Sequence, residues 1–140
     1  RNIKKFVDKM NSINLKISKN KFIDFDFSKL EKDDFVYCDP PYLITTGSYN
    51  DGNRGVKDWT IEDEKELLQI LDNLNSRGIK FALSNVLVAN DKRNEILTEW
   101  SKKYNVFIIK NTFNNSNYRR KSKNDTIEVL ITNYGEVENE

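Results

Sequence analysis

The sequence predicts a single α/β domain built on a mainly parallel sheet. Short apolar segments with strand character alternate with segments of helical periodicity, each roughly 10 to 17 residues long. Such alternation requires crossover connections, which place neighbouring strands parallel. The last two predicted strands are joined by residues 110–125, which lack a helical period, so we expect the final strand to be antiparallel. A length of 140 residues favours one hydrophobic core over two.

The first third of the chain is predicted to contain a helix and two strands. Apolar residues at helical spacing predict a helix over residues 3–10. Residues 21–27 alternate aromatic and acidic side chains and predict a strand. Phe35–Cys38 predicts a second strand, which two prolines end. Residues 43–58 have the Gly, Thr, Ser, Asn and Asp content of a loop.

A long amphipathic helix is predicted to follow this loop. Thr60 is a candidate N-cap, and Asp63 stands where a capping box places its acidic partner. Gly78 stands where the helix is expected to end. The predicted buried stripe consists of Leu67, Leu71 and Leu74.

The last part of the chain is predicted to contain three strands and one helix. Lys80–Ser84 predicts a strand, and Asn90 or Asp91 is expected to cap the helix after it. Two further strands are predicted at Val106–Ile109 and Thr126–Thr132. The expected inner face of the helix consists of Ile96, Trp100 and Tyr104.

Composition restricts the chemistry that this chain can perform. The formal net charge is +1, the mean hydropathy is −0.73, and no run approaches the roughly 20 apolar residues of a membrane-spanning helix. The single cysteine, Cys38, excludes an internal disulfide. The absence of histidine excludes Ser-His-Asp and Cys-His triads, and we expect no metal site. Any catalysis therefore depends on carboxylates, hydroxyls, backbone groups or a cofactor.

The most informative segment is Asp39-Pro40-Pro41-Tyr42, at the end of a predicted strand. Each proline fixes its own φ and keeps the preceding residue out of the helical region, so Asp39 and Pro40 are held extended. A carboxylate and the neighbouring carbonyl can then face the same space beyond the strand, where open α/β sheets bind ligands. The structural alternative is a Pro-Pro turn in which Asp39 caps the next segment.

Two fixed acceptors suit the exocyclic amine of a nucleobase, which offers two N–H donors. Such an amine is a poor nucleophile because its lone pair is delocalised into the ring. Acceptors on both hydrogens favour a more tetrahedral nitrogen whose lone pair faces an electrophile. Tyr42 supplies a flat face on which a base extruded from the duplex can stack.

The surrounding sequence resembles a known family. Residues 35–42, FVYCDPPY, are similar to the catalytic motif of the Dam-type (D12 class) adenine-N6 DNA methyltransferases. Leu83-Ser84-Asn85 resembles the next strand end of that family, and Glu128–Tyr134 resembles its last strand. Phe25-Asp26-Phe27 resembles the strand end near the cofactor adenine. The resemblance covers nearly all of the chain in the family's order.

The resemblance implies a Rossmann-like methyltransferase fold and transfer of a methyl group from S-adenosylmethionine to adenine N6 of a flipped base in duplex DNA. By matching position, Asp39 and the Pro40 carbonyl would hold the target amine, Pro41 would complete the motif, and Tyr42 would stack on the adenine. The implied cofactor contacts are Asp26, Phe27 and Asp39.

The sequence departs from the family's pattern in one large respect. The expected Phe-x-Gly-x-Gly cofactor motif, the first two strands and the target-recognition insert do not occur, and the chain contains no Gly-x-Gly. The chain also begins at Arg1, directly within a helical pattern. We therefore expect residues 1–140 to form the C-terminal part of one catalytic domain, a partial fold whose partner is the missing N-terminal portion. The exposed sheet edge of such a part predicts association when it is isolated.

Two loops are expected to contact DNA. The segment before the last strand is rich in Lys and Arg, contains aromatic residues and has no acidic residue between 110 and 124. The loop after the catalytic motif is placed to close over the flipped base. The predicted DNA contacts are Tyr49, Arg54, Tyr118, Arg119, Arg120 and Lys121. The alternatives are a solvated surface loop and a mobile connector.

The leading hypothesis is thus a DNA adenine methyltransferase of a bacterial restriction–modification or orphan methylation system, acting on DNA in the cytoplasm. One alternative is the same chemistry on RNA guanine N2 or DNA cytosine N4, because Asp-Pro-Pro-Tyr alone does not specify the base. The other is a truncated module that binds DNA or a partner chain and is inactive alone.

Overall fold

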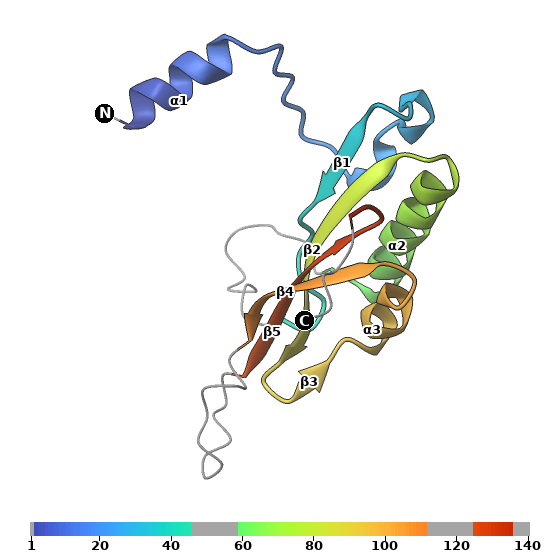
Figure 1. Cartoon of the computed structure of the whole chain (residues 1–140). Coiled ribbons are helices and arrows are strands. Elements are labelled where there is room, and N and C mark those ends of the chain that lie inside the picture. Colours follow the sequence, from blue (N-terminus) through green and yellow to red (C-terminus); the bar gives the residue numbers. More distant parts are fainter. Residues whose placement is uncertain (1, 46–58, 112–124, 136–140) are drawn as a thin grey trace.

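A computed structural model describes residues 2–45, 59–111 and 125–135 (Figure 1). It confirms a mixed α/β architecture with one sheet. The helices are α1 (Asn2–Asn11), α2 (Ile61–Ser76) and α3 (Glu95–Ser101), with 3₁₀ turns η1 (Phe22–Asp24) and η2 (Phe27–Lys29). The strands are β1 (Phe35–Cys38), β2 (Lys80–Ala89), β3 (Lys92–Arg93), β4 (Asn105–Asn111) and β5 (Thr126–Thr132).

The sheet has the strand order β1-β2-β5-β4, with β3 paired to β2. The last strand is antiparallel, as predicted, and it inserts between β2 and β4. Because β5 opposes both neighbours, β1, β2 and β4 run in one direction. The prediction of a mainly parallel sheet is nevertheless wrong, because most neighbouring strands pair antiparallel. Among the described strands, only β1 and β2 form a parallel pair. The order of strands along the sequence did not predict that β5 lies between β2 and β4.

Helices α2 and α3 cover one face of the sheet, and the core lies between them and the strands (Figure 1). Trp100 of α3 is buried and stands near Phe81 of β2, with ring centroids 6.1 Å apart. The opposite face carries alternate residues such as Phe35 and Tyr37, which are 52% and 59% exposed. Fully buried apolar residues of the core include Leu71, Leu74, Phe81, Leu83, Leu97 and Ile131.

Helix α2 begins and ends at the predicted positions. The Thr60 hydroxyl accepts from the Asp63 N–H at 3.1 Å, while the Asp63 carboxylate accepts from the Thr60 N–H at 2.9 Å. This reciprocal capping box satisfies donors that the first turn leaves open. At the other end, Gly78 adopts φ +73°, a conformation that glycine accepts without strain.

The strand predicted at residues 21–27 is wrong, because the segment forms η1 and η2 instead. The Asp26 carboxylate accepts from the Ser28 N–H at 3.2 Å and turns the chain locally. Phe22 and Phe27 both pack against the core, whereas an extended chain would place residues five apart on opposite faces. Local side-chain capping therefore prevailed over the alternating pattern.

The predicted cap of α3 is also wrong. Asn90 and Asp91 adopt φ 51° and 67° and form the turn between β2 and β3. Asn94 caps the helix instead, since its side chain accepts from the Leu97 N–H at 3.0 Å. Trp100 is buried as predicted, Ile96 is half-buried, and Tyr104 lies beyond the end of the helix.

Helix α1 forms as predicted but has no buried residue, and Figure 1 shows it apart from the sheet and its covering helices. Ile3 is 80% exposed and Phe6 is 65% exposed. No helix in the described part of the chain is long and apolar enough to span a membrane.

Candidate functional site

Asp39 and Tyr42 follow strand β1 directly and lie where that strand ends. Val36 and Cys38 pack toward the core and fix the strand, and Asp39 emerges exposed directly after it. The Tyr42 hydroxyl donates to Asp39 Oδ1 at 3.0 Å. The structure thus brings together the carboxylate and the aromatic ring that the sequence analysis selected.

The turn after the motif is held by its own hydrogen bonds. The Tyr42 carbonyl accepts from the Thr45 N–H at 2.9 Å and from the Thr45 hydroxyl at 3.2 Å. Partial burial, together with the hydrogen bond to Asp39 and the charge of that carboxylate, raises the pKa of Tyr42 to about 12. The tyrosine therefore remains a neutral donor at physiological pH.

Cys38 is a free, half-buried cysteine at the end of β1. Burial raises the pKa of its thiol to about 11, so the thiolate that would react is scarce at neutral pH. The described residues also contain no group of three Cys, Asp or Glu side chains that could hold a metal ion.

Strand β2 continues past the end of β1 and supplies further polar groups. The last pair of the parallel register is Cys38 with Leu83, so Ser84 lies one step beyond it, beside the start of the motif. Ser84 shares a 2.7 Å hydrogen bond with the Tyr37 hydroxyl. The strand predicted to end at Ser84 actually extends to Ala89, so Leu83-Ser84-Asn85 is internal to β2.

A buried carboxylate, Glu64, lies in the first turn of α2. It is 0% exposed and accepts hydrogen bonds from Trp59 Nε1 at 2.6 Å, Asn94 Nδ2 at 3.0 Å and Asn85 Nδ2 at 3.3 Å. Burial raises the pKa of Glu64, and the three donated bonds oppose that effect. The sequence analysis missed this residue, although it lies on the Leu67–Leu71 stripe, one turn earlier, where a charged residue is unexpected.

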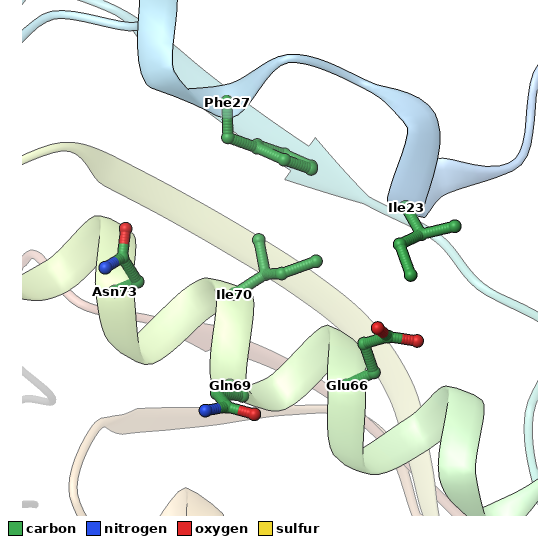
Figure 2. Close-up of a pocket in the computed structure, with 6 residues that line it drawn as sticks. All are labelled: Ile23, Phe27, Glu66, Gln69, Ile70 and Asn73. Carbon is green, nitrogen blue, oxygen red and sulfur yellow. The ribbon is translucent and has the colours of Figure 1, made fainter.

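A second feature is a hollow of about 330 Å³ between the 3₁₀ turns and the exposed side of α2 (Figure 2). Ile23, Phe27 and Ile70 form apolar walls, and polar α2 side chains complete the rim. The full lining consists of Ile23, Phe27, Glu66, Gln69, Ile70 and Asn73. Phe27, a predicted cofactor contact, is therefore part of a concave surface.

Asp26 is engaged in local bonds and does not line this hollow. The hydroxyl of Ser28 is the main cause that lowers the pKa of Asp26, with partial desolvation opposing it and Lys29 adding a weaker attraction at 3.6 Å. The exposed Asp26 carboxylate acts in this structure as the cap of η2.

The structure does not bring Asp26 and Phe27 to the end of the sheet that carries Asp39. The Phe27 carbonyl accepts from Arg77, which follows α2 and precedes β2, so Phe27 is anchored where β1 and β2 begin. Asp39 lies where β1 ends.

The predicted DNA contacts lie outside the described residues. Tyr49 and Arg54 fall within 46–58, and the basic segment from Tyr118 to Lys121 falls within 112–124. Their roles stay predictions. At the border of that segment Lys110 is described, and its ammonium lies 3.8 Å from Glu128.

Comparison with known proteins shows the family of the chain. The model of the D12 class N6 adenine-specific DNA methyltransferases matches residues 1–133, and the chain belongs to this family. The type II methyltransferase M.FokI of Planomicrobium okeanokoites is 52% identical over 129 residues, which are 92% of this chain and 20% of that protein.

Two further relatives are modification methylases. StsI of Streptococcus sanguinis is 49% identical over 135 residues, covering 95% of this chain and 20% of that protein. LlaI of Lactococcus lactis subsp. lactis is 36% identical over 136 residues, covering 97% of this chain and 21% of that protein. The chain thus spans about a fifth of the length of these curated relatives.

Proposed function

We propose that this chain forms the part of a site-specific DNA methyltransferase that holds the target adenine, in a bacterial restriction–modification or orphan methylation system. The observation that carries the proposal is the Asp39–Tyr42 motif, which presents an exposed carboxylate and an aromatic ring together at the end of β1. Family membership and the names of the relatives support the reaction type.

In this proposal each residue of the motif has a separate role. The Asp39 carboxylate and the Pro40 carbonyl accept the two hydrogens of the adenine amine and turn its lone pair toward the electrophile. Pro41 fixes the backbone that carries Tyr42. The Tyr42 ring stacks on the base, whose extrusion from the duplex costs a few kcal/mol. The amine proton leaves after the transfer, so no strong general base is needed.

S-adenosylmethionine would supply an electrophilic methyl group. The hollow beside Phe27 fits one part of such a cofactor, because apolar walls with a polar rim suit a flat heteroaromatic ring. Phe27 and Ile23 would contact the adenine of the cofactor. Asp26 would join them only after its hydrogen bonds from Ser28 break. Asp39 would face the methyl end of the cofactor. We propose that another portion of the enzyme, which carries the glycine motif absent here, completes the pocket.

The proposed partner is duplex DNA, met in the bacterial cytoplasm. Tyr49, Arg54, Tyr118 and the basic run Arg119–Lys121 are proposed to contact it. Each charge that meets a phosphate should contribute about −0.9 to the slope of log affinity against log salt. Neutralising Arg119 and Arg120 together should therefore reduce the slope by about 1.8.

The direct test is methyl incorporation from labelled S-adenosylmethionine into unmethylated duplex DNA. We would assay the 140-residue chain alone and together with the portion of the relative M.FokI that precedes the matched segment. Asp39→Ala is expected to abolish transfer and to leave most of the DNA affinity. Asp24→Ala serves as control, because that exposed carboxylate lies outside the motif.

The same assay separates the alternatives. Incorporation into RNA, or at cytosine N4, would contradict adenine as the target base. Incorporation by the chain alone would contradict the need for a second portion. Near wild-type transfer by Asp39→Ala would contradict the central assignment. Binding of DNA without transfer in either preparation would favour the inactive module.

A further inference from the structure

Glu64 joins three separate parts of the chain through one buried carboxylate. Its Oε2 accepts from the Trp59 indole, and its Oε1 accepts from Asn85 on β2 and Asn94 before α3. No cation is bonded to it among the described residues, so three N–H donors stabilise a fully buried group. A fully satisfied buried polar network of this kind rigidifies the structure around it.

The two asparagines can serve only as donors toward Glu64, because backbone N–H groups occupy their oxygens. Asn85 Oδ1 accepts from the Val86 N–H at 2.8 Å, and Asn94 Oδ1 accepts from the Leu97 N–H at 3.0 Å. Both side-chain amides are thereby oriented with Nδ2 toward the carboxylate. An apolar residue at position 64 would leave both amides unsatisfied.

This network lies at the level where the motif leaves the sheet. Cys38 is paired with Leu83, so the register, continued in parallel, sets Asp39 beside Ser84 and Pro40 beside Asn85. Trp59 is the first described residue after the segment that follows the motif. Its ring also stands 5.3 Å from that of Phe22 in η1.

We propose that Glu64 is a positioning residue for methyl transfer. It fixes the start of α2 and the Trp59 end of the post-motif segment against β2, so that Tyr42 and the Pro40 carbonyl keep one geometry. The proposal rests on the proposed function, because the geometry that it protects is that of the target-base site. Displacing reacting groups by about 1 Å lowers a rate by up to about 100-fold.

The test uses a carboxylate on the same helix as its matched control. Glu64→Gln keeps the size of the side chain but forces its NH₂ to face a donor, either Trp59 Nε1 or the asparagine amides. Asp72 also accepts from an indole, that of Trp100, at 2.9 Å, but on the side of α2 that faces α3. Asp72→Asn therefore weakens the packing of the same helix and removes none of the hydrogen bonds of Glu64.

In the preparation that methylates DNA, Glu64→Gln is expected to lower the single-turnover rate at least about 10-fold, with DNA Kd changed less than about threefold. Asp72→Asn should keep the rate within about twofold at a temperature where both variants are folded. Trp59→Phe removes the indole N–H that would face the amide introduced by Glu64→Gln. The rate of the Glu64→Gln/Trp59→Phe double variant should therefore fall by less than the two single-variant effects combined. A Glu64→Gln rate matching that of Asp72→Asn would overturn the proposal.

A second readout does not depend on methylation. The chain has two tryptophans, so their indole N–H signals are easily told apart by NMR. Glu64→Gln should shift the Trp59 signal and speed exchange of the Thr45 amide, which is bonded to the Tyr42 carbonyl. Asp72→Asn should shift only the Trp100 signal. Unchanged Thr45 exchange in Glu64→Gln would overturn the proposal, whereas absent wild-type transfer would count against the proposed function alone.

Discussion

At the scale of single residues, the contact between Tyr42 and Asp39 links the two side chains proposed to hold the target base. The Tyr42 hydroxyl donates to Oδ1 of Asp39, one of the two oxygens of the carboxylate proposed to accept the adenine amine. The raised pKa of Tyr42, about 12, means that this donor is present throughout the neutral range. The amine therefore meets a carboxylate that already accepts one hydrogen bond and has further acceptor sites.

Substitutions at Tyr42 separate its ring from its hydroxyl. Tyr42→Phe keeps the stacking face and removes the competing donor, so kcat/KM on unmethylated duplex should stay within about threefold of wild type. Tyr42→Ala loses base stacking, worth about 1–3 kcal/mol, and kcat/KM should fall roughly 5- to 150-fold. Equal losses in the two variants would show that the hydroxyl, not the ring, is what matters.

Asp72 illustrates a carboxylate whose role is structural. It accepts from Trp100 Nε1 at 2.9 Å, Tyr104 Oη at 2.6 Å and Lys103 Nζ at 2.7 Å, and so ties α2 to the segment around α3. Desolvation alone would raise the pKa of Asp72, but the bonds from Lys103, Tyr104 and Trp100 together lower it below the usual value.

The lowered pKa of Asp72 predicts a pH dependence of stability with a definite sign. Its stabilising contribution is complete above the unfolded pKa, near 4, and is lost as the pH falls through the lower folded pKa. In urea unfolding, Asp72→Asn should cost about 1 kcal/mol between pH 5 and 7, a modest value because the group is partly exposed. The difference from wild type should shrink below pH 4. A difference that grows there would refute the assignment.

At the scale of elements, Arg77 fastens the 3₁₀ turns to the end of α2. Its guanidinium donates to the carbonyls of Phe27 at 2.9 Å, Leu30 at 2.7 Å and Ser28 at 3.3 Å. One planar group with several N–H donors binds three carbonyls, and that of Phe27 also accepts from the Leu30 N–H at 3.2 Å. The wall of the hollow that Phe27 forms therefore depends on a residue outside its own segment.

Arg77→Ala should lower the free energy of urea unfolding by about 1–2 kcal/mol, because the three carbonyls lose the bonds that the guanidinium donates. Arg77→Lys should recover less than half of the lost free energy of unfolding, since one ammonium cannot bind all three carbonyls. Lys102→Ala is the control, because its ion pair with Glu99 is exposed and should contribute less than about 0.5 kcal/mol. An unchanged stability in Arg77→Ala would mean that the turns hold without the guanidinium.

Element prediction from the sequence succeeded where the signal was local. The capping box of Thr60 and Asp63 and the stop at Gly78 confirm the limits of α2. It failed at residues 21–27, where the Asp26 cap outweighed strand alternation, and at Asn90 and Asp91, where two positive φ angles made a hairpin turn. In each failure a polar side chain suited two local structures, and packing selected one.

At the scale of the whole molecule, several large apolar side chains of the described residues remain exposed. Helix α1 exposes Phe6 at 65%, and β1, an edge strand, exposes Phe35 at 52% and Tyr37 at 59%. An unpaired edge beside apolar surface is a template for association.

We therefore expect the isolated 140-residue chain to self-associate at micromolar concentrations, as measured by light scattering after size exclusion. Phe6→Glu removes apolar surface from α1 and should shift the distribution toward monomer. Lys5→Gln, on the same exposed helix, should leave the distribution unchanged. A wild-type chain that is monomeric at high concentration would contradict the expectation.

The candidate site was found only in part from the sequence. Asp39 and Tyr42 were selected because two prolines after a strand constrain the backbone, and the structure places the two side chains in contact. Glu64 was missed, because its importance depends on Asn85 and Asn94, distant in sequence and brought together only by the fold. Asp26 and Phe27 stay predicted cofactor contacts, anchored at the level where β1 begins.

The sequence by itself determined the limits of α2, the strand that carries the motif and the residue types proposed to hold an amine, because these depend on neighbours a few residues apart. Tertiary structure decided where β5 inserts, which turns replaced a strand, and which carboxylate is buried among three donors. These outcomes depend on side chains that meet across tens of residues, and the free energy of burying them is settled only when the core packs.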